Sequence, residues 1–365
     1  MNGRDRYIAA LNNQKADRLP CQVHDWMSYY LKTYLNGMTD YEAYANFGMD
    51  PVIYQNPKMI YSEKDLAKWS VKKINLGTDS DGVRSTRIVI TTPEGTMVET
   101  RGDSPITGWI TKHMVQTKED FELWNKYFPI PVGVDWTPVR EAKNRIGDKG
   151  IVRGGFYDFG QGSPWQSFAF MFGTEEIIMT AIDEPDWLHH VLNTLLEKKL
   201  RVIELAGKNE MDLIETGGGA GSSTVISPTI HKEFCLPYDQ KQHAALHRQG
   251  TKTVYHLCGG FMPLLDLVVE NGADGLETMT PPIMGGDCIM SECTKRIGDR
   301  MFFIGGFDQN AGFEKGNPEL VKRMVFDLHK DCPDGGYIVS PSDHFFYGDP
   351  KNLQAFVDAA KECTY

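Results

Sequence analysis

Short apolar runs alternate with stretches of helical periodicity along this chain. Each apolar run ends in polar or glycine-rich residues, and apolar positions then recur at helical spacing. We expect strands at eight such runs, which span residues 19–24, 51–55, 150–154, 211–216, 252–258, 273–277, 301–304 and 336–339. Strands that alternate with helices indicate a parallel sheet with helices outside it. Eight units are what a (β/α)8 barrel requires, and a doubly wound open sheet is the alternative that the same alternation allows.

One segment breaks this alternation. Residues 83–92 and 96–101 are rich in β-forming residues and flank the turn Pro93-Glu94-Gly95. This pattern predicts a β-hairpin inserted between two barrel units, at about residues 80–110. The chain has no repeat, low-complexity tract or long linker, so we expect one α/β domain over residues 1–365, a (β/α)8 barrel with an N-terminal helical segment and the inserted hairpin.

Composition and charge narrow the class of partner. Hydrophobic residues make up 41% and charged residues 24% of the chain, which is typical of a globular protein. The 38 basic and 49 acidic residues give a net charge of −11, which argues against nucleic acid or an anionic membrane as the main partner. No apolar run approaches the roughly 20 residues of a membrane span, and no signal peptide is evident, so we expect a cytoplasmic protein. The seven cysteines include no CxxC pair and favour reduced thiols.

Ionisable side chains gather where the expected strands end, which is where barrel enzymes have their active sites. These residues are His24, Glu215, His256, Cys258, Glu277, Asp308, Asp343 and His344. His256 and Cys258 are two apart on a strand and therefore point to the same side. An imidazole and a thiol that face one way suit zinc, whereas the alternative is a buried cysteine beside a hydrogen-bonded histidine. Asp343, His344, Glu215 and Glu277 are all placed to supply a third ligand.

Glycine and aromatic residues lie near the same strand ends. The glycine-rich residues 217–221 lack the lysine of a P-loop and the spacing of a dinucleotide-binding loop. They indicate either backbone held close to a ligand or a flexible loop. Aromatic residues cluster at positions 156–172, and Phe159 and Trp165, beside Gly160 and Gly162, are suited to contact a flat apolar substrate. We include Tyr157 and His24 with Trp165 as candidate substrate-binding residues.

Motifs along the whole chain resemble the uroporphyrinogen decarboxylase superfamily. They are RDRYIAALN (4–12), ADRLP (16–20), FGTEE (172–176), DEP (183–185), ISP (226–228), HLCG (256–259), IGDR (297–300) and NLQAF (352–356). The resemblance implies a (β/α)8 barrel, in agreement with the strand count. In the decarboxylase branch an arginine-bearing motif follows the first strand and no metal is needed. Residues 21–30 of this chain contain no arginine.

The HxC element is similar to that of the cobamide-dependent methyltransferase branch. That likeness implies a zinc ion held by His256, Cys258 and a third ligand after the last strand, where the branch commonly has cysteine. The corresponding residues 340–344 contain no cysteine, and Asp343 falls nearest the expected place, with His344 as the alternative. It also implies a corrinoid (cobalamin) carried by a partner protein, with Gly217, Gly218 and Gly259 as candidate contacts.

The expected zinc ligands favour methyl transfer from a donor substrate to the corrinoid over methyl transfer from the corrinoid to a thiol. A zinc site with fewer thiolates is more electrophilic, which favours polarising an ether oxygen over activating a thiol. We therefore expect an O-demethylase-type methyltransferase, which moves a methyl group from a methoxyaromatic substrate to the cobalt of a corrinoid protein, with Glu215 or Glu277 as proton donor. The alternatives are a methylcobamide:thiol methyltransferase, a metal-free lyase acting on a tetrapyrrole, and a non-catalytic barrel that binds a methylated ligand or a corrinoid partner. The oligomeric state is left open, with a homodimer as one option.

Overall fold

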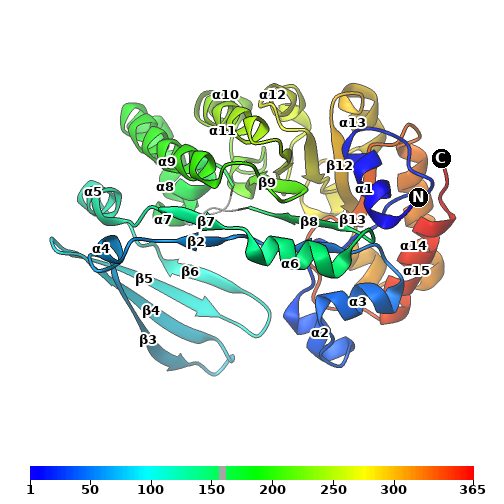
Figure 1. The fold of residues 1–365 in the computed structure, drawn as a ribbon, viewed down its shortest axis with the longest axis horizontal. Helices are drawn as coiled ribbons and strands as arrows, with labels where there is room; N and C mark the ends of the chain where they lie inside the picture. The colour runs from blue at the N-terminus through cyan, green and yellow to red at the C-terminus, as the bar shows by residue number, and fades with distance from the viewer. Residues whose placement is uncertain (156–161) are drawn as a thin grey trace.

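A parallel sheet forms the centre of the structure, a computed structural model that describes residues 1–155 and 162–365 (Figure 1). Seven strands pair in the order β1-β8-β9-β10-β11-β12-β13. Their bounds are β1 (Val52–Tyr54), β8 (Ile151–Gly154), β9 (Leu213–Gly217), β10 (Lys252–His256), β11 (Gly275–Thr278), β12 (Phe302–Phe307) and β13 (Tyr337–Pro341). Most of their residues are buried, because helices cover one face and the barrel interior the other. This double burial explains the nearly continuous apolar runs in the sequence.

The eighth expected strand is an extended segment beside β13. Cys21 forms a parallel bridge with Val339, and the amide of Gln22 donates to the Val339 carbonyl over 3.0 Å. The segment thereby brings residue 24 to the edge where β13 ends. All eight expected strands thus have a counterpart, and the (β/α)8 barrel predicted from the sequence is confirmed.

Helices surround the sheet. The helices outside the barrel are α6 (Thr137–Ile146), α7 (Pro164–Phe172), α8 (Thr174–Asp183), α9 (Pro185–Ala206), α10 (Pro228–Phe234), α11 (Leu236–Arg248), α12 (Leu265–Glu270), α13 (Met290–Ile297), α14 (Pro318–Asp331) and α15 (Pro350–Glu362). Several start with a capping side chain followed by proline, as at Ser163, Ser227, Asn317 and Asp349. The cap satisfies an unpaired amide and proline fixes the first helical φ, so the sequence sets these helix starts locally. The N-terminal helices are α1 (Gly3–Leu11), α2 (Ser28–Tyr34) and α3 (Asp40–Phe47).

The predicted hairpin is the middle of a larger inserted sheet. Its strands β4 (Arg84–Thr91) and β5 (Thr96–Asp103) pair as expected, but β3 (Ser70–Thr78) and β6 (Gly108–Lys112) extend it to four antiparallel strands. The sheet lies beyond the carboxyl end of β1 and projects to one side of the barrel (Figure 1). The prediction was too short because β3 is exposed along nearly its whole length and therefore shows no apolar run.

Two hydrophobic clusters support these parts. The larger one fills the barrel and the spaces under its outer helices. In the smaller one, Ile90 and Met97 of the inserted sheet pack with Phe121 and Trp124 of α5 (Lys118–Tyr127) and with α7 and α9. The short helix α4 (Glu63–Leu66) and the antiparallel pair β2 (Lys58–Ile60) and β7 (Gly133–Asp135) connect the sheet to the barrel. Within the described residues, none of the helices has the length and apolar character needed to cross a membrane.

Candidate active site at the barrel mouth

A buried arginine joins two of the expected acids. Arg153 of β8 donates from Nη1 to Glu277 Oε2 over 2.9 Å and from Nη2 to Glu277 Oε1 over 2.9 Å. Its Nη2 also donates to Glu215 Oε2 over 2.8 Å. Its guanidinium carbon lies 4.7 Å from the centre of the Tyr54 ring. The strands β8, β9 and β11 thus deliver one cation and two acids to the same end of the barrel.

This pairing sets the charge of Glu277. Burial alone would raise the pKa of this carboxyl, but the charge of Arg153 and the hydrogen bond with His256 hold it well below its ordinary value. Glu277 is therefore a carboxylate that accepts hydrogen bonds, which makes it a poor proton donor near neutral pH. Sequence reasoning did not select Arg153, although a charged residue inside the otherwise apolar strand at 151–154 was a usable signal.

His256 stands between Glu277 and Cys258. Its Nδ1 lies 3.0 Å from Glu277 Oε1, and since a carboxylate only accepts, Nδ1 carries the hydrogen. Burial lowers the pKa of His256, but hydrogen bonds with Cys258 and Glu277 outweigh it and raise the pKa well above its ordinary value. The interaction with Cys258 agrees with the same-side spacing of the two residues, and their role as metal ligands stays a prediction. A histidine held at one nitrogen by a carboxylate presents the other nitrogen to a metal.

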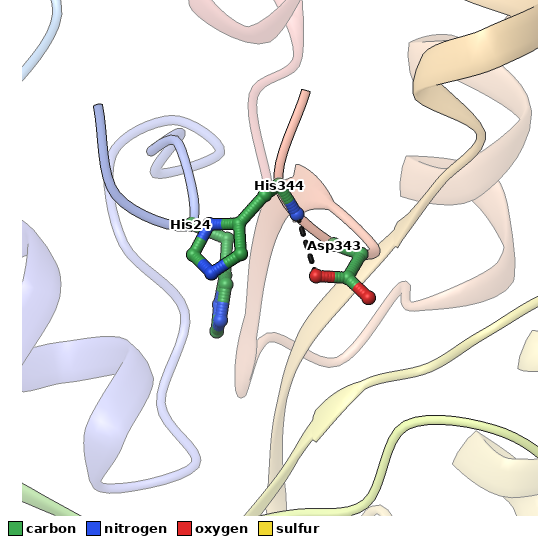
Figure 2. A group of neighbouring side chains, drawn as sticks. All are labelled: His24, Asp343 and His344. Carbon is green, nitrogen blue, oxygen red and sulfur yellow. Dashed lines mark hydrogen bonds between the residues drawn. The ribbon is translucent and has the colours of Figure 1, made fainter. Parts of the chain in front are cut away.

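Three further donors, His24, Asp343 and His344, lie together where the first and last strands end (Figure 2). The His24 ring centre lies 5.2 Å from that of His256 and 4.9 Å from that of His344. Figure 2 shows His24 beside Asp343 and His344, and Asp343 Oδ1 accepts the backbone N–H of His344 over 2.7 Å. Burial lowers the pKa of His24 to about 4, so its imidazole is neutral at pH 7.

The structure groups these donors differently from the predicted ligand set. In the described part of the chain, two sets of three have all their ligand atoms within 4.8 Å of one another: His24 with Asp343 and His344, and His24 with His256 and Glu277. His256, Cys258 and Asp343 do not form such a set. His24 belongs to both sets, whereas the sequence predicts it as a substrate contact.

The glycine-rich strand ends are packed against each other. An added Cβ at Gly218 would lie 2.3 Å from Gln166 Oε1, and one at Gly259 would lie 2.9 Å from Ser222 Oγ. Gly217 ends β9 with a φ of +81°, a conformation that favours glycine. The segment continues as the short 3-10 helix η1 (Gly219–Gly221), so it is an ordered turn rather than the flexible loop that the sequence allowed.

Of the aromatic residues predicted to contact a substrate, only Trp165 lies within the described residues. Trp165 lies in α7 rather than in a loop and is 1% exposed, and its Nε1 donates to the Ala220 carbonyl over 2.8 Å. Because its ring is buried and bonded to Ala220, Trp165 holds the glycine-rich turn in place and is not exposed to a substrate. Tyr157, Phe159 and Gly160 lie outside the described residues. Asp308 caps the next turn by accepting the amides of Asn310 and Ala311.

Comparison with known proteins identifies the family of this barrel. The chain matches the uroporphyrinogen decarboxylase (URO-D) family over residues 109–363, more than half of its length, and so belongs to that family. Its relatives include enzymes of two kinds. The uroporphyrinogen decarboxylase of Neisseria meningitidis is 27% identical over 219 residues, which are 56% of this chain and 58% of that protein. The methylated-thiol–coenzyme M methyltransferase of Methanosarcina mazei is 24% identical over 203 residues, 55% of this chain and 51% of that protein.

The curated relatives are matched over part of their length, and a solved structure over all of it. The chain spans about half the length of the curated relatives that it matches. A methyltransferase structure from Methanosarcina mazei covers 99% of both chains with a TM-score of 0.65 at 16% identity. At that identity the likeness shows the shared barrel fold.

Proposed function

We propose that this protein is a zinc-dependent, corrinoid-linked methyltransferase of the URO-D family. The observation that supports the proposal most is the hydrogen bond between His256 and Glu277 at the barrel mouth, with Cys258 two residues further along the chain. An imidazole oriented by a carboxylate, with a thiol nearby, is the donor arrangement of a zinc site. Family membership and the methyltransferase among the relatives support the reaction class.

The residues present fit a zinc ion in number and in kind. His256 and Cys258 supply two donors, and the third comes from the facing group of His24, Asp343 and His344. The sequence predicts Asp343 in that place, with His344 as the alternative. Bound zinc would act as a Lewis acid on the oxygen of a methyl ether, which is otherwise a poor leaving group.

The protein groups around this centre have separate roles in the proposal. Glu277 holds the orientation of His256, and Arg153 keeps Glu277 ionised and in place. Of the two carboxyl groups, Glu215 is the candidate to contact the leaving group, because its side chain is 15% exposed whereas that of Glu277 is fully buried. Its Oε1 lies 3.7 Å from His256 Nδ1, so it borders the same space.

The proposed reaction moves a methyl group from a methoxyaromatic substrate to the cobalt of a corrinoid protein. His24 and Tyr157 are the candidate contacts to the substrate, and the turns bearing Gly217, Gly218 and Gly259 are where the corrinoid would approach. Trp165 contributes to substrate binding by supporting the turn at Ala220. The preference for an ether oxygen rests on the absence of cysteine from residues 340–344.

A thiol substrate is the second candidate. It is favoured by the relative from Methanosarcina mazei, whose name specifies methylated thiols and coenzyme M. A metal-free lyase receives less support from the geometry. Such an enzyme needs cations free to bind the carboxylates of its substrate, and Arg153 is already neutralised by Glu215 and Glu277.

The test combines the purified protein with cob(I)alamin and a panel of methoxylated aromatics. Formation of methylcobalamin, followed by its absorption spectrum, together with release of the free phenol, is the expected result, and zinc chelation should stop it. Cys258→Ala should abolish the reaction, whereas Cys363→Ala, a change to a buried cysteine at the C-terminus, should leave it intact.

Two outcomes would overturn parts of the proposal. Zinc-dependent methylation of a thiol from methylcobalamin, with no activity on any ether, would show that the enzyme takes the methyl group from the corrinoid instead of giving it to the corrinoid. Release of carbon dioxide from uroporphyrinogen by the metal-free protein would overturn the methyltransferase assignment itself.

A further inference from the structure

We infer that His24 is a ligand of the zinc ion at His256 and Cys258, a role that the sequence analysis assigned to Asp343. The inference rests on the proposed function, since it concerns the same metal centre. It replaces a donor expected near residue 343 with an imidazole from the opposite end of the chain. Three observations support this assignment: the geometry around His24, the lack of a hydrogen bond from its ring to the described residues, and the backbone conformation that follows it.

The fold brings His24 to the metal centre from the first strand. The bridge between Cys21 and Val339 lays the first extended segment against β13, so that residue 24 reaches the mouth beside the end of the last strand. The His24 ring then lies between the rings of His256 and His344, at 5.2 and 4.9 Å. His24 therefore contacts a histidine at the end of β10 and a histidine after the last strand.

Donor distances favour His24 over Asp343. The ligand atoms of His24 and His256 belong to a set that lies within 4.8 Å, whereas no described set of three contains Asp343 together with His256. Two donors on one tetrahedral zinc lie about 3–4 Å apart, given metal–ligand distances of roughly 2.0–2.3 Å. His24 and His256 can meet this requirement by a small movement of side chains.

His24 has no other hydrogen-bonding role in the described residues. Its side chain is only 6% exposed, yet neither ring nitrogen forms a hydrogen bond within that part of the protein. Buried polar side chains are nearly always paired, because an unpaired one loses its contacts with water and gains none in return. The neighbouring His344 Nδ1 is a fully buried nitrogen without a hydrogen-bond partner among these residues. A cation next to both rings would supply the missing partner.

The backbone after His24 is held in an uncommon conformation. Asp25 has a φ of +86°, although it is not glycine, and its carboxylate accepts the N–H of Trp26 over 2.8 Å. Trp26 in turn stacks on Phe47 with the ring centres 6.0 Å apart. Residues outside glycine adopt such a φ at a cost of about 1–3 kcal/mol, which the surrounding packing must offset. The turn fixes the direction in which His24 leaves the strand.

A His24 ligand would also change the charge of the centre. Zinc with two neutral imidazoles and one thiolate carries a net charge of +1, whereas replacing one imidazole by the Asp343 carboxylate would make it neutral. Three protein ligands leave a fourth position open for a substrate oxygen. The higher charge strengthens polarisation of that oxygen, which agrees with an ether as the methyl donor.

The test measures metal binding rather than activity. Zinc content is determined by mass spectrometry after dialysis against graded chelator, and the cobalt-substituted protein is examined by its d–d and thiolate charge-transfer absorption. His24→Ala should weaken zinc binding by more than the roughly 10- to 100-fold that loss of an outer-shell partner costs. The cobalt form should keep the thiolate band from Cys258 while its d–d bands shift, which a merely structural role of His24 would not cause.

Control variants separate the possible failures. His243→Gln, at a buried histidine paired with Thr216 and Asn271, should keep its zinc. If Asp343→Asn or His344→Gln loses zinc while His24→Ala retains it, the inference is overturned and the last-strand ligand stands. If Cys258→Ala retains full zinc, or if the wild-type protein binds none, the proposed zinc site fails along with the inference. Circular dichroism confirms that each variant is folded.

Discussion

Arg153 and Glu277 form a two-point ion pair in the interior of the barrel, with both N–O distances at 2.9 Å and neither side chain exposed. They come from β8 and β11, which are not neighbours in the sheet, so the arginine reaches across the barrel interior. The pair keeps Glu277 ionised, and Glu277 then fixes the tautomer of His256. An interaction that looks structural thus determines which nitrogen of His256 is presented at the mouth.

Replacing Arg153 by methionine should destabilise the protein strongly. The change leaves Glu277 as a buried carboxylate without its cation, and breaking a buried pair in this way costs about 3–5 kcal/mol. Urea unfolding at pH 7 measures the loss. Arg140→Met, which breaks the exposed pair with Glu210, is the control and should change the midpoint little. Equal shifts in the two variants would show that the Arg153 pair contributes no more than a surface pair.

Acid should destabilise the fold through His243. Burial lowers the pKa of this histidine to about 4, while an unfolded histidine titrates near 6.5. Between these values the unfolded chain binds more protons than the native one, so stability falls as the pH drops from about 6.5 to about 4. The His243 contribution to this fall is up to about 3 kcal/mol. In His243→Gln the dependence of unfolding free energy on pH should flatten in that window.

A suitable control for the His243 prediction is a histidine at the surface, because His243 itself is buried. Its Nδ1 donates to the Asn271 carbonyl over 2.7 Å and its Nε2 lies 2.8 Å from Thr216 Oγ1. The ring is buried, so a charged imidazole there would lose its contacts with water, which is the main cause of the lowered pKa. His190 is 51% exposed at the surface. His190→Gln should leave the pH dependence unchanged, and parallel curves for wild type and His243→Gln would contradict the assignment.

Sequence periodicity predicted the strands well because a buried parallel strand is apolar along its whole length. The same logic placed the ends of β9, β10 and β11, and with them Glu215, His256 and Glu277, at one mouth. Periodicity carries no information about which side chains meet across the interior. For this reason the pairing of Arg153 with Glu277 and the position of His24 between two donor sets appeared only in three dimensions.

Exposed and partly covered elements were harder to predict. The strand β3 lies at an edge of the inserted sheet and is exposed along nearly its whole length, so lysines and asparagine interrupt any alternation there. Trp165 was assigned to a loop because it follows glycines, yet Ser163 and Pro164 start a helix at that point. A capping serine before proline was the local signal that could have corrected this assignment.

Trp165→Phe should weaken the turn at Ala220. The substitution keeps an aromatic ring but removes the Nε1–H that donates to the Ala220 carbonyl. Leaving a buried acceptor unpaired costs about 1–3 kcal/mol, so urea unfolding should shift by that amount. Phe168→Leu, a change at a buried ring of the same helix that makes no such hydrogen bond, controls for repacking. Unchanged stability in Trp165→Phe would mean that another donor replaces the indole.

Gly219→Ala tests whether the glycine-rich turn makes room for the Cys258 thiol. A Cβ at Gly219 would lie 2.6 Å from Cys258 Sγ, closer than unbonded atoms can approach, so the thiol must move. A Cβ at Gly221, in the same turn, would meet its nearest atom, Leu257 Cδ1, at 3.7 Å, which is ordinary contact. Because Sγ ends a short side chain that can rotate, the fold should survive in both variants. We expect Gly219→Ala to weaken zinc binding at least about tenfold and to change the rate at which Cys258 is alkylated in the metal-free protein, with Gly221→Ala close to wild type. Identical zinc affinity and alkylation rates in the two variants would show that the turn does not position the thiol.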